Sequence, residues 1–66
     1  MPENDNAPIF LSPWMTREEV ADRLRMKKST LEAWAVTGYG PRFAKFGKHV
    51  RYHIDTVIDW ENAQVR

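Results

Sequence analysis

The fold is decided by residues 16–34, which read TREEVADRLRMKKSTLEAW. This stretch opens with a T-x-x-E pattern formed by Thr16 and Glu19. In such a capping box the threonine hydroxyl accepts a hydrogen bond from the glutamate amide, and the glutamate carboxylate accepts one from the threonine amide. The pattern predicts a helix that begins after Thr16 and runs from about Arg17 to Arg25.

A second apolar stripe follows a short break at residues 25–27. Leu31, Trp34 and Ala35 lie three and four residues apart, a spacing that places them on one face of a helix. Gly38 suits the left-handed conformation that ends a helix, so we expect this helix to stop there. Two short helices joined by a tight turn predict a helix-turn-helix.

A hairpin is indicated by residues 43–52, which read FAKFGKHVRY. Gly47 followed by one more residue between two β-prone runs is the signal of a two-residue type II′ turn. Side chains alternate along a strand, so Phe43 and Phe46 cannot point to the same side, and either one of them is half exposed or a bulge intervenes. The register predicted by this turn pairs Phe43 with Tyr52, Ala44 with Arg51, Lys45 with Val50 and Phe46 with His49.

The chain continues into a last helix of about residues 56–64. Asp55 is a good N-cap for it, and Val57 and Trp60 lie three apart and can close the core. The predicted order is helix, helix, hairpin, helix. This is a mostly α fold with a small β-hairpin, a winged helix-turn-helix domain over residues 14–66.

The first part of the chain has a different character. Residues 1–13 contain three of the four prolines and show no apolar period, so we expect a flexible tail. Ile9, Phe10 and Leu11 interrupt its polarity and could contact the domain or a neighbouring copy.

Length and composition limit the class of protein. A chain of 66 residues makes at most one small domain, and the absence of cysteine excludes a disulfide framework and a thiolate zinc site. Apolar stretches fall far short of the ~18 residues needed to cross a bilayer, and no secretory leader opens the chain, so we expect a soluble cytoplasmic protein without a membrane partner. Apolar residues at regular periods usually belong to the core, and we therefore assign four such residues to it: Trp34, Val50, Tyr52 and Trp60.

Charge is distributed very unevenly, although the net charge is only +1. Residues 1–22 carry one cation against five acids, a balance of −4, and residues 53–66 carry one against three, a balance of −2. Residues 23–52 carry eight cations against Glu32 alone, a balance of +7. Such a concentration is typical of a nucleic-acid surface, whereas an ordinary solvated face would usually mix acids with the bases.

Catalysis and metal binding find little support in the residue types. Ser29, His49 and Asp55 follow no known triad spacing, and the chain leaves little room for a pocket. His49 and His53, if they lie on one strand, are about 13 Å apart, which is too far to share a metal ion. We therefore expect neither an enzyme nor a cofactor, a metal or a small-molecule substrate.

DNA recognition fits the organisation better. The B-DNA major groove accepts one helix, whose amino-terminal residues meet the base edges. At the start of the second helix, Lys28 can donate to guanine, Ser29 can donate or accept, and Glu32 can accept from cytosine. Alternatively, Glu32 is a solvated residue that pairs with Lys28 one turn earlier, and Thr30 supports the turn or touches a phosphate.

The hairpin offers a second contact beside that helix. Lys48 at its tip could enter a minor groove, with Lys45 and Arg51 near phosphates. The alternative is a charged tip that only prevents edge-to-edge aggregation.

Five motifs occur in order along the chain: T-x-x-E-x-A-x-x-L from Thr16, S-T-L-x-x-W from Ser29, G-P at Gly40, G-K-x-V-R-Y from Gly47 and D-x-V-x-x-W from Asp55. Together they resemble the excisionase and AlpA-like winged helix-turn-helix family, relatives of the MerR-type DNA-binding domain. The resemblance covers nearly everything after residue 13.

The resemblance implies that the second helix lies in the major groove and the wing in the adjacent minor groove. Where the family often has glycine in the turn this chain has Arg25, and where it often has serine or threonine this chain has Lys27. Either the turn is looser or both are extra phosphate contacts. The implied base-reading residues are Lys28, Ser29, Thr30, Glu32 and Ala33, the wing residues are Gly47 and Lys48, and the phosphate contacts are Arg25, Lys27, Lys45, His49 and Arg51.

The same resemblance implies two classes of function. Excisionases are phage recombination directionality factors that bend attachment-site DNA and help an integrase choose excision, whereas AlpA-like proteins regulate transcription. Only 14 residues follow the hairpin, too few for the long dimerisation helix of a MerR-type activator, so we favour the excisionase. Its expected partners are double-stranded DNA, a phage integrase and neighbouring copies of itself. A small adaptor that binds only protein is the alternative from another class.

Overall fold

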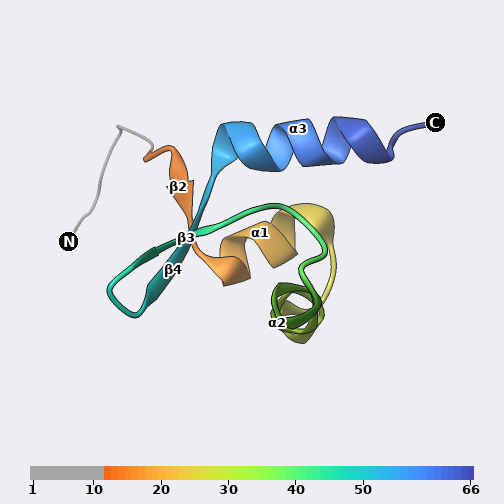
Figure 1. The fold of residues 1–66 in the computed structure, drawn as a ribbon. Coiled ribbons are helices and arrows are strands. Elements are labelled where there is room, and N and C mark those ends of the chain that lie inside the picture. The colour runs from red at the N-terminus through yellow and green to blue at the C-terminus, as the bar shows by residue number, and fades with distance from the viewer. Residues whose placement is uncertain (1–11) are drawn as a thin grey trace.

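Three helices and a three-stranded antiparallel sheet follow one another in the computed structural model, which describes residues 12–66 (Figure 1). The predicted order of helix, helix, hairpin and helix is confirmed, with one additional short strand at the start. Most of the predicted tail, with Ile9, Phe10 and Leu11, lies outside the described residues. The elements are β2 (Trp14–Met15), α1 (Arg17–Leu24), α2 (Lys28–Thr37), β3 (Ala44–Phe46), β4 (His49–His53) and α3 (Ile54–Gln64).

Helix α1 begins with the predicted capping box. Thr16 Oγ1 accepts from the Glu19 amide at 3.1 Å, and Glu19 Oε1 accepts from the Thr16 amide at 2.8 Å. The helix ends at Arg25, which adopts the left-handed conformation with φ of 58°. The Met26 amide then bonds to the Ala21 carbonyl at 2.9 Å. This bond closes the turn and argues against the looser turn, which was one of the two alternatives for Arg25 and Lys27.

Helix α2 also ends as predicted. Gly38 takes the left-handed conformation with φ of 80°, and its amide bonds to the Trp34 carbonyl. At the other end Lys27 is the extended N-cap residue and provides no side-chain cap. Only Leu31 of this helix is fully buried, which leaves most of the helix surface open to a partner.

The hairpin forms in the predicted register around Gly47, which has φ of 66°. Phe43 packs against the Tyr52 ring at 5.5 Å between centroids, and Phe46 packs against Trp14 at 5.1 Å. Both phenylalanines remain partly exposed, at 36% and 51%, and the register stays regular without a bulge.

The third strand was not predicted. Strand β2 pairs with β4, with Trp14 opposite His53 and Met15 opposite Tyr52, so that β4 lies in the centre of the sheet. A strand of two residues shows no alternation of its own, and only its pairing with the distant residues Tyr52 and His53 defines it.

The prediction that Asp55 caps α3 is wrong. His53 is the cap, and its Nδ1 accepts from the Asp55 amide at 3.2 Å. The reason is that β4 runs directly into the helix, with the Ile54 amide bonded to the Pro13 carbonyl at 2.7 Å, so the last extended residue is His53.

The core lies where α1, α2, α3 and β4 meet. Of the predicted core residues, Tyr52 is fully buried, while Val50, Trp34 and Trp60 are half-buried. The two tryptophan rings contact each other at 5.5 Å between centroids. The hydrophobic core cluster consists of the buried residues Val20, Ala21, Leu31, Tyr52 and Val57. None of the helices in residues 12–66 is long and apolar enough to span a membrane.

Alanine substitution is expected to destabilise the domain more at Gly40 than at Gly38, although both glycines have positive φ. A Cβ at Gly40, where φ is 88°, would lie 2.7 Å from Trp34 Cε3, whereas a Cβ at Gly38 would meet nothing within 4 Å. Gly38→Ala should therefore cost about 1–2 kcal/mol of unfolding free energy through the backbone alone. Gly40→Ala should lose ~1–3 kcal/mol more through overpacking. Equal losses in denaturant titrations would contradict the close packing against Trp34.

The ion pair between α1 and α3 is expected to make stability depend on pH. Arg23 Nε and Nη2 donate to the Glu61 carboxylate at 2.6 and 3.0 Å, and this hydrogen bonding holds the pKa of Glu61 below its ordinary value. A lowered pKa in the folded state stabilises the protein at neutral pH, and the contribution is lost as the pH falls through that pKa.

Glu61→Gln should accordingly reduce the unfolding free energy at neutral pH and have little effect in acid, when the wild-type carboxyl is also protonated. Thermal unfolding of both proteins across the acid range measures this difference. A difference that stays constant with pH would show that the ion pair does not act as described.

Candidate nucleic-acid interface

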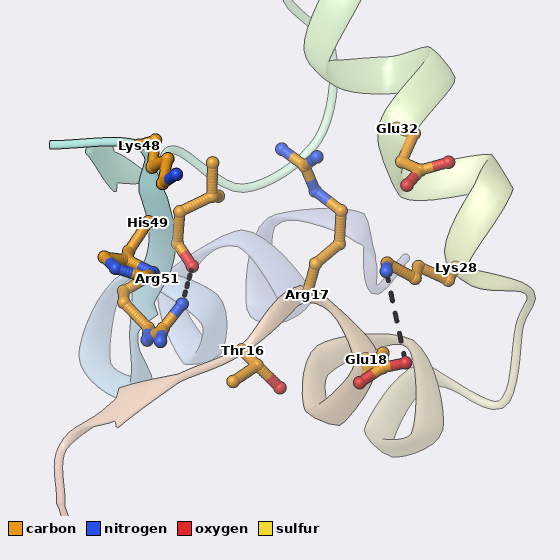
Figure 2. Close-up of a pocket in the computed structure, with 9 residues that line it drawn as sticks. Thr16, Arg17, Glu18, Lys28, Glu32, Lys48, His49 and Arg51 are labelled. Atoms are coloured by element: carbon orange, nitrogen blue, oxygen red, sulfur yellow. Dashed lines mark hydrogen bonds and ion pairs between the residues drawn. The ribbon is translucent and has the colours of Figure 1, made fainter. Parts of the chain in front are cut away.

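A groove of about 310 Å³ lies between the start of α1, the first turns of α2 and strand β4 (Figure 2). It collects side chains that are far apart in the sequence. Five of them are predicted site residues: Lys28, Glu32, Lys48, His49 and Arg51. The others are Thr16, Arg17, Glu18 and Val50.

The exposed face of α2 begins beside this groove. Lys28, Ser29, Glu32 and Ala33 are exposed, because they lie on the face opposite the buried Leu31. An exposed helix start is the part of a helix-turn-helix that meets base edges in the major groove. The structure therefore leaves these four predicted base-reading residues accessible to DNA.

Thr30 differs from its neighbours on α2. Its side chain is half-buried, and its amide bonds to the Lys27 carbonyl at 3.0 Å in the first turn. Its half-burial distinguishes Thr30 from the four exposed base-reading candidates on this helix.

Lys28 does not form the pair with Glu32 that helical spacing suggested. Within the described residues its Nζ lies 4.0 Å from Glu18 Oε2, on the preceding helix. Both side chains are at least half exposed, and such surface pairs contribute little to stability. Lys28 can therefore exchange Glu18 for an acceptor on DNA at small cost in free energy. Glu32 lines the groove without an ion pair to Lys28.

The wing carries its cations along both strands. Gly47 and Lys48 are exposed at the turn, and Lys45 and His49 are exposed on the strands that flank it. Arg51 is half-buried, and its Nη1 donates to the Val50 carbonyl at 2.7 Å. That bond holds the guanidinium against the strand and leaves its other N–H groups for an outside acceptor.

Several predicted site residues lie elsewhere. Arg25 and Lys27 are exposed in the turn between α1 and α2, and neither lines the groove. Ser29, Thr30 and Ala33 also lie outside it. Lys45 lines a second groove of about 530 Å³, together with Arg17 and Glu32, between α2 and the hairpin.

Arg17 is the residue that sequence reasoning missed. It stands among the acids of residues 1–22, where its charge is outweighed. In the structure it lines both grooves and points into the gap between α2 and the wing (Figure 2). The packing of α1 against β4 places Arg17 beside the wing, and no local sequence motif indicates this position.

The chemistry of this surface suits a polyanion. Arginine, lysine and histidine side chains from three elements surround the groove, with Glu18 and Glu32 on the α-helical side. Among residues 12–66 no group of three or more histidine, cysteine or acidic side chains is placed to hold a metal ion.

Comparison with known proteins agrees with this geometry. A family model described as a helix-turn-helix domain matches residues 14–65, which include every helix and strand of the structure. A search of curated proteins finds no match to the chain. Because the family match spans far more than half of the sequence, the chain belongs to the helix-turn-helix domain family and binds double-stranded DNA with sequence preference.

Proposed function

We propose that this protein is an architectural DNA-binding protein, a phage excisionase that bends attachment-site DNA and directs an integrase toward excision. The observation that carries the proposal is the basic groove of about 310 Å³ between the start of α2 and the wing. A domain in which α2 and the wing lie side by side can place α2 in a major groove and the wing in the neighbouring minor groove. The phosphates between the two grooves would then lie against the domain.

The packing of α3 against its own domain supports an architectural role. Trp60 packs on Trp34, and Glu61 is bonded to Arg23 of α1. One side of α3 is therefore committed to its own domain, and we expect no symmetric dimer seam on this helix. Copies on DNA would then meet through unlike surfaces, and such heterologous contacts build a short filament rather than a closed pair.

Bending follows from that arrangement. Each copy that places its wing in a minor groove deforms the duplex locally, and copies on adjacent sites add their deformations. An integrase recognises the resulting curved assembly. An AlpA-like regulator would instead act at an isolated promoter site.

Duplex binding should weaken steeply with salt. If four to six phosphates are neutralised, the slope of log K against log salt should be about −4 to −5, at ~0.9 per phosphate.

Lys28→Ala and Ser29→Ala should lose ~1–3 kcal/mol of preference for the target over random duplex. Arg66→Ala, which removes a cation at the exposed chain end, is the matched control and should change neither quantity. A flat salt response would contradict DNA binding through this surface.

Bending should depend on the wing tip. On a fragment with several target sites, a circular-permutation gel assay should show a bend that grows with the number of bound copies. Lys48→Ala should weaken binding and reduce the bend. Light scattering should show a monomer in the absence of DNA. Unbent DNA carrying several copies, or a tight symmetric dimer in free solution, would favour the regulator instead.

A further inference from the structure

We infer that Arg17 is a phosphate contact at the junction of the two DNA-binding elements, and that Tyr52 and Phe43 hold its guanidinium in place for that contact. The inference rests on the docking proposed above, with α2 in one groove and the wing in the next. It adds a residue from a third element, the first turn of α1.

The position of the Arg17 side chain is fixed by two contacts. Its Nε donates to the Tyr52 hydroxyl at 3.2 Å, and its Cζ lies 5.3 Å from the centre of the Phe43 ring. Tyr52 is only 1% exposed, so the hydroxyl that accepts this hydrogen bond belongs to a rigid group. The Tyr52 ring is also within 5.9 Å of Cζ, a distance at which a cation is attracted to an aromatic face.

These contacts leave the outer edge of the guanidinium unused. Of its five N–H groups, one is engaged by Tyr52, and the other four are on the two terminal nitrogens. Within residues 12–66 those nitrogens have no hydrogen-bond acceptor and no ion-pair partner. Figure 2 shows them directed into the gap between α2 and the wing.

That gap is where a DNA backbone would pass. In a helix-turn-helix the first helix crosses the backbone while the second enters the major groove, and Arg17 is the first residue of the first helix. With the wing in the adjacent minor groove, the phosphates between the two grooves face this residue. The planar fork of arginine matches two phosphate oxygens, and a side chain already held in position loses less conformational freedom on binding.

A purely structural role for Arg17 is the competing explanation. In that case the bond to Tyr52 serves only to tie α1 to the sheet. The two roles differ in what they predict for DNA, because a phosphate contact contributes equally on every sequence and carries a salt dependence, whereas a structural tie does neither.

The test compares Arg17→Ala, Arg17→Lys and Tyr52→Phe with wild type and with the control Arg66→Ala. Binding to target and to random duplex is titrated by fluorescence anisotropy at several salt concentrations, below the thermal transition of every variant. Arg17→Ala should weaken both duplexes by the same factor, about tenfold, and reduce the salt slope by about 1.

The conservative variants separate charge from position. Arg17→Lys should keep the salt slope, because the charge remains, and should lose part of the affinity because a lysine does not form the fork. Tyr52→Phe keeps the ring and removes the acceptor hydroxyl, so it should weaken binding severalfold at unchanged slope. The Lys28→Ala variant, which is expected to lose target preference, shows that the assay resolves base reading.

Three results would overturn the inference. Binding of Arg17→Ala with wild-type affinity and an unchanged salt slope, with or without a lower thermal midpoint, would make Arg17 a purely structural residue. A loss confined to the target duplex would make it a base-reading residue. If wild type and Arg66→Ala themselves bind duplex without salt dependence, the proposed docking fails together with the inference, and a normal Lys48→Ala effect distinguishes the first two cases from this one.

Discussion

The burial of Tyr52 on the central strand is the constraint on which the rest of the structure depends. Its ring contributes to the core shared by the helices, and its backbone pairs with Met15 of β2. Its hydroxyl reaches the surface side of the core and accepts from Arg17. One side chain therefore connects the packing that stabilises the domain with the basic groove proposed to contact DNA. A buried tyrosine normally needs a partner for its hydroxyl, and here that partner is a cation at the binding surface.

Local signals explain why much of the fold could be predicted from the sequence. The capping box at Thr16, the helix end at Gly38 and the hairpin turn at Gly47 are each determined by a few adjacent residues, and all three form as expected. The features that escaped prediction depend on distant partners. Strand β2 exists only through its pairing with β4, and His53 replaces Asp55 as the cap because the same pairing extends the strand to that residue.

The candidate site divides in the same way. Exposure of Lys28 and Ser29 follows from helical periodicity, since the buried face of α2 is set by Leu31, and exposure of Lys48 follows from its place in a turn. Arg17 could not be found in this manner, because sequence places it in an acidic segment and only the fold brings it beside the wing. Of the acids on α1, Glu18 lines the groove beside Arg17, whereas Glu19 and Asp22 do not. Charge counted along the chain therefore describes a binding surface only as far as the fold keeps neighbours together.

Differences in how the cations are held suggest how affinity and specificity are divided. Arg17 and Arg51 are each fixed by a hydrogen bond to the protein, at 3.2 and 2.7 Å, and a fixed cation suits the regular spacing of phosphates. Lys28 and Lys48 are exposed, and Lys28 is paired only weakly, at 4.0 Å. Side chains with this freedom can adjust to the edges of different base pairs. In the proposed docking, the fixed contacts would align the duplex on the domain, and the exposed lysines would contribute to discrimination between sequences.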